Sequence, residues 1–419
     1  MSIAAIVTAP SIDNDPITTA FGARRTLLGA WIYTEVSFFV WILLGPLALF
    51  MADAWSLSRG EIGLLVSLPI LAGTLLHLPI GLLTDRFGAW RVGLVVHGGL
   101  ALDLVLLAWP MPMATPVLFV AAVFLGMAGV SFAVALPLVS ARFPVEHQGK
   151  ALGLTAFGGT GALLAAFIAP GLAESQGWRS VMALALGLVL FSGLMFGWTA
   201  RHATAPRTHQ PAAWSHYLHV LRHADTYWFC LFHAITFGGM VSLAASLVGY
   251  FHDQFRFSPS LAGTMATLCI LASALFRPVG GWLADHWGGI RTLQVAFVTV
   301  ALCVVLLTLL PPSAAAGAVA LVAVVMSAFG AGNGALLQLL PIRFRRQMGV
   351  ITGLVGAAGG LGGFLFVFAA SGLQQNLAIF QPVFLFYGAL GLLALVGLAS
   401  VKRRWRTTWG APRMTNARV

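Results

Sequence analysis

Two basic side chains stand at matching places in this chain, and their types and spacing could support chemistry. Arg277 and His77 each stand four residues before a glycine, Gly281 and Gly81, that opens the same repeated loop. Arg277 also lies inside the long apolar run from Thr267 to Leu283. A cation in membrane hydrocarbon costs about 2.5–3.5 kcal/mol, so it normally has a function and faces a cavity. A guanidinium binds planar anions through paired hydrogen bonds, and the sequence therefore predicts an anion site at Arg277.

The composition indicates that this arginine lies in a membrane. Of 419 residues, 59% are hydrophobic and only 8% are charged, which excludes an ordinary soluble domain. Twelve apolar runs follow one another, each of about 20 residues, the length that spans about 30 Å of hydrocarbon. Because lipid offers no partner for backbone polar groups, each run should be a helix. The runs begin near Thr26, Glu61, Val92, Pro116, Lys150, Val181, Tyr227, Leu261, Leu293, Ala316, Gly349 and Phe380.

The net charge is +11, but the Lys and Arg residues gather in the loops on one side of the membrane and do not form a nucleic-acid-binding patch. Of the 23 Lys and Arg residues, only Arg59, Arg179 and Arg256 fall in one set of alternate loops, and only Arg277 falls in a run. The others fall in the two ends of the chain and the other set of loops. This positive-inside bias predicts a multi-pass protein of the bacterial inner membrane, in contact with lipid and with both termini in the cytoplasm.

The chain repeats itself at an offset of 200 residues. The sequence GLLTDRFGAWR at Gly81–Arg91 returns as GWLADHWGGIR at Gly281–Arg291, and the glycine-rich block at Gln148–Gly161 returns at Met348–Gly362. Two six-helix halves around a central path resemble the parallel-repeat design of major facilitator transporters, whose substrate lies at the midplane. We predict a cytoplasmic tail over residues 1–25, bundles over 26–200 and 226–401, a cytoplasmic linker over 201–225 and a tail over 402–419.

The repeated loop also resembles the signature of that superfamily between its second and third spans. The glycines would let helices approach closely, and the aspartates would lie at a helix N-terminus across the interface between the bundles. The alternative is that the loop charges only set the topology, although this would not require an aspartate in both copies. The predicted gate residues are Gly81, Asp85, Arg86, Arg91, Gly281, Asp285 and Arg291.

Three stretches narrow the resemblance. They are FFVWILLGPL at Phe38–Leu47, the block Gly126–Leu154 and the glycine-rich block Phe329–Phe364. Together they resemble the nitrate/nitrite porter family of the major facilitator superfamily, over nearly the whole chain. The resemblance implies twelve transmembrane helices and a planar anion clamped by two arginines, one in the second span and one in the eighth.

The resemblance assigns residues to an anion site, with two or three of the usual positions altered, namely His77, Thr160 and His233. Arg277 matches the arginine of the eighth span, but His77 stands where the second arginine is expected. Phe237 and His233 lie one helical turn apart in the seventh span. Asn333 could hydrogen-bond either the substrate or the adjacent helix. The predicted substrate-binding residues are Arg277, His77, Phe237, His233, Phe132, Thr160 and Asn333.

Ionisable residues in the spans suggest coupling to protons. Arg277 with a neutral His77 supplies one positive charge, and protonation of His77 would supply a second. We therefore hypothesise that the anion and a proton bind together, although His77 could also simply hydrogen-bond a neighbouring helix. Glu35 could relay protons, pair with Arg277 or make a structural hydrogen bond, and His233 could join a proton path. Asp103 and His97 are six residues apart, share no helix face, and are expected to be structural.

No P-loop, nucleotide fingerprint, metal-ligand cluster or catalytic triad is visible, so we predict no enzyme activity, metal or cofactor. We predict a monomeric secondary active transporter of a small inorganic anion, nitrate or nitrite, that works by alternating access. Its coupling would be proton symport or exchange for a counter-anion. Two alternatives stay open from the sequence. One is a carrier of another small anion such as a short carboxylate, and the other is a membrane sensor that binds the anion without carrying it.

Overall fold

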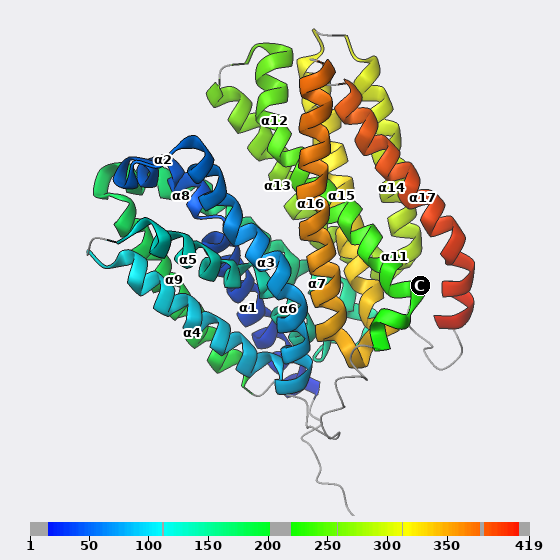
Figure 1. Ribbon diagram of the computed structural model, residues 1–419. Coiled ribbons are helices and arrows are strands. Elements are labelled where there is room, and N and C mark those ends of the chain that lie inside the picture. Colours follow the sequence, from blue (N-terminus) through cyan, green and yellow to red (C-terminus); the bar gives the residue numbers. More distant parts are fainter. Residues whose placement is uncertain are drawn as a thin grey trace, which may run out of the picture.

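The computed structural model describes residues 16–110, 113–201, 219–257, 259–311, 313–377 and 381–409. All regular structure in these residues is helical, and twelve segments among them are long and apolar enough to cross a membrane. Figure 1 shows two groups of helices, the blue-to-green N-terminal half and the green-to-red C-terminal half, which meet at one end and diverge at the other. The predicted all-α fold of two six-span bundles is therefore confirmed.

The helices of each half are as follows. The N-terminal half contains α1 (Pro16–Trp41), α2 (Leu44–Trp55), α3 (Arg59–Phe87), α4 (Ala89–Ala108), α5 (Thr115–Leu125), η1 (Gly126–Val130), α6 (Ser131–Ser140), η2 (Val145–His147), α7 (Gln148–Phe157), η3 (Gly158–Thr160), α8 (Gly161–Gln176) and α9 (Trp178–Ala200). The C-terminal half contains η4 (His219–Arg222), α11 (Ala224–His233), η5 (Ala234–Gly238), α12 (Gly239–Phe255), α13 (Pro259–Trp287), α14 (Gly289–Leu309), α15 (Ala315–Phe344), η6 (Arg345–Gln347), α16 (Met348–Leu377) and α17 (Gln381–Trp409).

Four spans are not the single α-helices that we expected. The first is interrupted by a turn at residues 42–43, between α1 and α2. The fourth and fifth spans contain 3₁₀ turns, η1 and η3, and the seventh contains one π-helical turn, η5. The 3₁₀ turns lie at glycines that pack directly on other backbone. A Cβ on Gly126 would lie 2.9 Å from the Pro69 carbonyl oxygen, and one on Gly158 would lie 3.0 Å from the Glu35 amide nitrogen. Glycine disfavours a regular helix but permits such close approach, which explains the turns at these positions.

The ends of the described chain also differ from the predicted boundaries. α1 begins at Pro16, inside the stretch that we assigned to the N-terminal tail, and α17 continues to Trp409, past the predicted end of the bundle. Residues 1–15 and 410–419, and most of the predicted linker, 202–218, lie outside the described residues. The division into tails, bundles and linker remains a prediction at these places.

Glycine contacts join the two halves along α7 and α13. A Cβ on Gly281 of α13 would lie 2.0 Å from the carbonyl oxygen of Gly149 in α7. One on Gly153 would lie 2.8 Å from the Arg277 carbonyl oxygen. Real side chains do not fit at such distances, so these helices touch backbone to backbone. This packing fixes the position of Arg277 along α7 of the N-terminal half.

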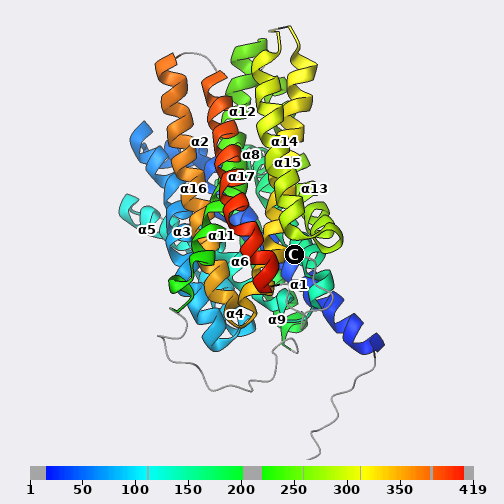
Figure 2. The ribbon, with the colours of Figure 1, turned by 90° about the vertical axis from the view of Figure 1, so that its right-hand side faces the viewer.

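The same contact recurs between α3 and α16, which lie side by side in both ribbon views (Figures 1 and 2). A Cβ on Gly81 would lie 2.2 Å from the Gly349 carbonyl oxygen, and one on Gly353 would lie 2.5 Å from the His77 carbonyl oxygen. The contact of Gly153 with the Arg277 backbone is therefore repeated, 200 residues away, by the contact of Gly353 with the His77 backbone. Both lines of contact run from the repeated loops to the level of these two side chains.

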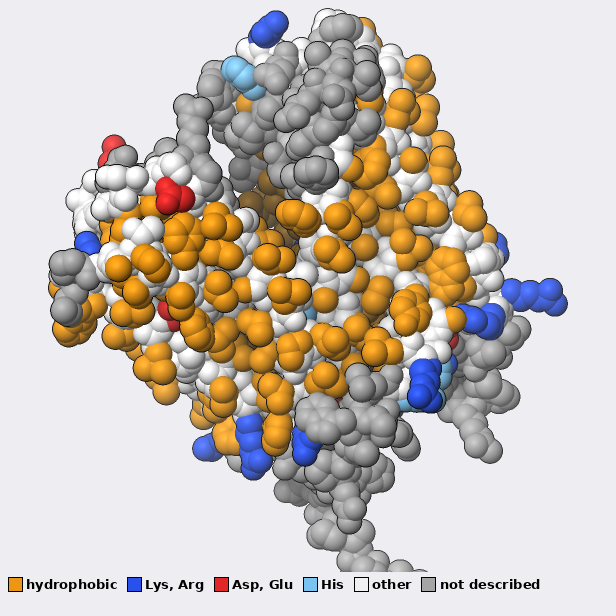
Figure 3. Space-filling view, viewed as in Figure 1, with side chains coloured by type: hydrophobic (Ala, Val, Ile, Leu, Met, Phe, Trp, Pro, Cys, Tyr) orange, Lys and Arg blue, Asp and Glu red, His pale blue; other side chains and the backbone are white. Residues whose placement is uncertain are grey.

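The two ends of the molecule differ in charge and in shape. We call the end formed by the repeated loops the basic end, because its loops carry Arg86, Arg91, Arg142, Lys150, Arg291 and Arg343. Lys and Arg side chains gather along this lower edge in Figure 3, and a hollow lies between the two lobes on the side away from it. The halves are therefore held together at the basic end and separate beyond the level of Arg277 and His77.

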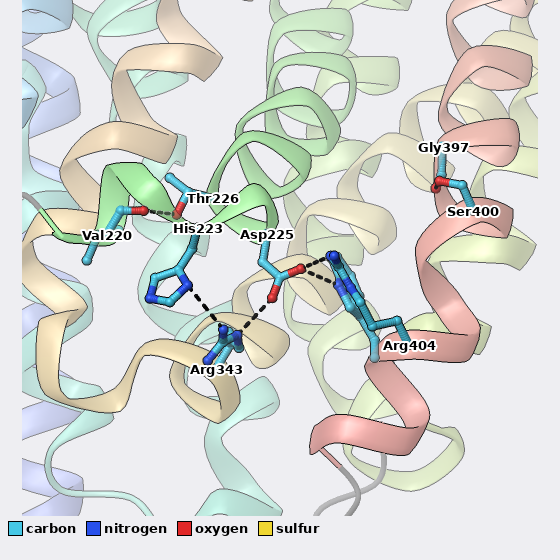
Figure 4. A network of polar contacts seen from close by, with 9 residues as sticks. Val220, His223, Asp225, Thr226, Arg343, Gly397, Ser400 and Arg404 are labelled. Atoms are coloured by element: carbon cyan, nitrogen blue, oxygen red, sulfur yellow. Dashed lines mark hydrogen bonds and ion pairs between the residues drawn. The ribbon is translucent and has the colours of Figure 1, made fainter.

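A buried carboxylate ties three helices of the C-terminal half together at the basic end (Figure 4). We placed Asp225 at the end of the linker, but it lies in the first turn of α11. Its Oδ2 accepts a hydrogen bond from Arg343 Nε of α15 at 2.8 Å. Its Oδ1 accepts from Trp405 Nε1 at 2.9 Å and pairs with Arg404, both on α17. The C-terminal half is thus cross-linked as one unit where it meets the N-terminal half.

The backbone contact at Gly281 predicts a specific sensitivity. In Gly281→Ala the new methyl group would meet the Gly149 carbonyl, so both helices must shift, at a cost of about 1–3 kcal/mol. We expect a lower thermal midpoint in detergent and faster amide hydrogen exchange in residues 148–152. Gly263→Ala, in the same helix but with no atom within 4 Å of its Cβ, is the matched control and should change neither. Equal behaviour of the two variants would contradict the proposed contact between the halves.

Candidate functional site

Arg277 is buried at the interface between the halves, with only 3% of its surface exposed. Its Nη1 donates a hydrogen bond to the Ala156 carbonyl of α7 at 2.8 Å, and its Nη2 donates to Met240 Sδ of α12 at 3.2 Å. Arg277 Cζ lies over the Phe237 ring, 5.4 Å from the ring centroid. The Nε atom is buried without a partner, and the ion pairs found among the described residues involve Asp225 only. The charge of Arg277 is therefore not balanced by a described carboxylate.

The local sequence of the fifth span explains how a guanidinium reaches the backbone of the other half. Ala156 lies near the end of α7, directly before the 3₁₀ turn η3. A Cβ on Gly159 within that turn would lie 2.8 Å from Arg277 Nη1. The absence of a side chain there leaves room for the guanidinium, and Gly153 one turn earlier allows the helix itself to approach.

The C-terminal half supplies a row of side chains next to Arg277. The π turn η5 separates His233 from Gly239, and it places the rings of His233 and Phe237 face to face, 5.4 Å apart with an interplanar angle of 4°. His233 Nδ1 is 3.1 Å from Asn333 Nδ2 of α15. The structure thus brings four predicted site residues together in the order Arg277, Phe237, His233 and Asn333. Single π turns are common at functional sites, because they rotate side chains out of the regular helical register.

His77 lies on the other half, in α3, and is 4% exposed. Its Nδ1 is 2.6 Å from the Gly73 carbonyl oxygen, and a carbonyl only accepts, so Nδ1 carries a proton. The Nε2 atom is then the position that could take up a second proton. This ring packs on Gly356 of α16, while the His233 ring packs on Gly359 one turn further along. His77 and His233, from opposite halves, thus pack on neighbouring turns of the same helix.

The remaining predicted residues lie on the N-terminal side of the site. The ring of Phe132 is 5.1 Å from that of Phe38, which in turn lies 3.7 Å from where a Cβ on Gly159 would stand. Thr160 Oγ1 donates to the two oxygens of Glu35 at 3.0 and 2.9 Å. Glu35 is therefore linked to the turn that holds Arg277 and does not form the ion pair with Arg277 that the sequence left open.

The aspartates of the repeated loops lie at helix N-termini of the opposite half. Asp85 accepts hydrogen bonds from the amides of Gly349 and Val350 at 2.7 and 2.8 Å. Asp285 accepts from the amides of Gly149 and Lys150 at 2.9 and 2.8 Å. A carboxylate at this end of a helix is stabilised by unpaired amides and by the helix dipole. At the basic end, the contact of α7 with α13 and the contact of α3 with α16 thus each end in the same interaction, an aspartate bound to the N-terminus of a helix.

The basic residues of the repeated loops differ in their surroundings. Arg86 lies over the ring of its neighbour Phe87 at 5.6 Å, and Arg91 and Arg291 are exposed. Their part in a gate remains a prediction. His97 is separate from the site, since it stacks on Tyr33 at 4.0 Å and contacts Ser192 Oγ at 3.2 Å within the N-terminal half.

Sequence reasoning missed two groups that touch Arg277. Met240 lies three residues after Phe237, so helical spacing could have placed it on the same face. Ala156 acts through its backbone carbonyl and carries no signal in its side chain. The Gly158–Gly159 pair that follows it was the only indication that the helix would be interrupted there.

Comparisons with known proteins agree with this geometry. The Major Facilitator Superfamily profile matches residues 30–367. The chain is 32% identical over 340 residues to the nitrite extrusion protein of Bacillus subtilis (strain 168), which covers 78% of this chain and 81% of that protein. It is 31% identical over 381 residues to the probable nitrate/nitrite transporter NarK2 of Mycobacterium tuberculosis, which covers 90% and 94%.

Solved structures share the fold. A bacterial homologue of the iron transporter ferroportin, in an outward-facing state, aligns with a TM-score of 0.72 and 17% identity over 91% of this chain and all of that one. The fucose:proton symporter FucP of E. coli aligns with a TM-score of 0.68 and 14% identity over 88% and 98%. The profile match, the extent of the curated similarity and the twelve spans in two halves agree that the chain belongs to the nitrate/nitrite porter family of the major facilitator superfamily.

Proposed function

We propose that this chain carries nitrate or nitrite across the inner membrane of a bacterium, with Arg277 as the principal anion-binding group. The observation that carries the proposal is the buried guanidinium, which has an unpartnered Nε and no carboxylate partner among the described residues. Such a group is stabilised when an anion enters and accepts its hydrogen bonds. Names of similar proteins, which include a nitrite extrusion protein and nitrate transporters, support nitrate or nitrite as the anion.

The proposed mechanism is alternating access. We take the basic end as cytoplasmic from the positive-inside bias, so the site faces away from the cytoplasm in this structure. Opening on the cytoplasmic side would separate α7 from α13 and α3 from α16, and so break the contacts of Asp285 and Asp85. Arg277 belongs to one half and bonds the Ala156 carbonyl of the other. An anion at Arg277 would therefore affect the energy of both conformations.

We propose proton symport as the coupling, because a titratable histidine faces the site at the place equivalent to Arg277. A protonated His77 would add a second positive charge to the site, and the bound anion would stabilise that charge in return. The rings of His77 and His233 pack on Gly356 and Gly359 of α16, and neither glycine carries a charge. Glu35 is a second candidate for the proton, since it hydrogen-bonds the turn that holds Arg277.

Replacing Arg277 by Lys tests the anion site. A lysine keeps the charge but loses the planar set of donors, so we expect anion binding to weaken about 10- to 100-fold. Binding of nitrate to the purified protein, followed by calorimetry, measures the effect. Arg256→Lys, at an exposed position between α12 and α13, is the control and should bind as the wild type does. Unchanged affinity in Arg277→Lys would exclude Arg277 as the anion-binding group.

Replacing His77 tests the coupling. As the pH rises, the wild-type His77 loses its proton and the second positive charge, so nitrate affinity should fall. In His77→Arg the charge is permanent, and affinity should remain high and flat over the same pH range. In His77→Gln it should remain low and flat. If the affinity for nitrate still depends on pH in both variants, another group binds the proton. Glu35→Gln then tests the second candidate.

The transport assay itself distinguishes the remaining alternatives. Uptake of labelled nitrate into proteoliposomes, with and without a proton gradient, separates proton symport from exchange, which would need nitrite inside the vesicle instead. Competition by nitrite, formate and acetate separates the inorganic anion from a short carboxylate. A protein that only senses the anion would bind nitrate but show no uptake and no counterflow.

A further inference from the structure

The donors of Arg277 are divided between its two edges. One edge carries Nη1, which donates to the Ala156 carbonyl at 2.8 Å. The other edge carries Nε and Nη2, whose N–H bonds point the same way and form the fork that planar anions grip. On this fork Nε is buried without a partner, and the acceptor recorded for Nη2 is Met240 Sδ at 3.2 Å. The guanidinium carbon lies over the Phe237 ring, 5.4 Å from its centroid. The fork is therefore the part of Arg277 with the weakest present partners.

Met240 is well placed to act at this fork. It lies on α12 just after the π turn η5, three residues from Phe237, and its side chain is half-buried. A thioether is only a weak hydrogen-bond acceptor, and methionine is the most adaptable of the large apolar side chains. An oxygen anion would therefore outcompete the sulfur, and the flexible side chain could move aside at little cost.

We propose that Met240 is the internal competitor of the transported anion. Its sulfur accepts from Nη2 until an anion with two coplanar oxygens takes both Nε and Nη2, and the side chain then swings out of the plane. The contact between Met240 Sδ and Arg277 Nη2 gives a buried N–H group a partner when no anion is bound. Part of the free energy of anion binding is then used to displace the sulfur. This role makes Met240 a determinant of affinity. It rests on the proposed function, because it assumes that the anion binds at Arg277.

Opposite substitutions at residue 240 test the proposal. Met240→Leu removes the acceptor at nearly constant volume, so we expect nitrate to bind about three- to tenfold more tightly. Met240→Glu places a permanent carboxylate beside the fork, and nitrate binding should weaken about 30-fold or more. Met326→Leu, a fully buried methionine of α15 in the same half, is the control and should leave affinity unchanged. A side chain that only fills space would give no tightening in Met240→Leu.

A second measurement follows the Met240 methyl group in the wild-type protein. The chain has only 12 methionines, so protein labelled with ¹³C at the methionine methyl groups gives a simple spectrum. The Met240 signal, assigned by its loss in Met240→Leu, should shift on titration with nitrate and saturate at the calorimetric affinity. The Met326 signal should not move.

The outcomes separate the two proposals. If the wild type binds no nitrate, the proposed function fails and this inference fails with it. If the wild type binds nitrate but the Met240 signal is unmoved, or Met240→Leu binds no more tightly, the anion site stands and the role of Met240 is wrong.

Discussion

A buried positive charge without a described carboxylate partner is the constraint on which the rest of this structure depends. Removing a guanidinium from water is costly unless its donors are satisfied, and here the protein satisfies them only in part. The Ala156 carbonyl and the Phe237 ring stabilise Arg277, yet one donor is unpartnered and another meets only a thioether. In the proposed function, the transported anion supplies the remaining stabilisation. If every donor of Arg277 had a partner within the protein, no donor would be left to bind an anion.

The internal repeat explains how the site can be asymmetric on a symmetric frame. Gly153 packs on the backbone of Arg277, and Gly353 packs on the backbone of His77 in the same manner. These two contacts involve only backbone on the α3 and α13 side, so they do not depend on the type of side chain at residue 77 or 277. One half therefore carries a permanent cation, and the other carries a group whose charge depends on pH. The frame of the carrier and the chemistry of its site are in this respect independent.

Contacts between the halves also restrict how the protein can move. Most of those described above lie between the basic end and the level of Arg277. They are backbone approaches, with Asp85 and Asp285 at the basic end. The helices at such contacts cannot easily slide past one another. A glycine packed directly on a carbonyl group either clashes with it or loses the contact when it shifts by a fraction of an ångström. Separation of whole halves is then easier than deformation within one. The Asp225 network favours the same outcome, since it holds α11, α15 and α17 together.

The sequence alone determined the frame. Composition and run length gave twelve spans, the offset of 200 gave two halves, and the position of Arg277 before Gly281 gave its partner His77. These inferences succeed because each depends on local composition or on exact repetition. The row Phe237, His233 and Asn333 was also within reach, through helical spacing and the resemblance to a known family.

Tertiary structure alone decided what Arg277 touches. The 3₁₀ turn that brings the Ala156 carbonyl within reach depends on how the fifth span packs against α1, and the place of Met240 on the fork depends on a π turn. Glu35 bonds Thr160 and not Arg277 for the same kind of reason. Hydrogen bonds of this kind join groups more than 30 residues apart, over distances where a shift of one ångström makes or breaks them. Periodicity and composition fix which helices form, but only the packing of those helices fixes such distances.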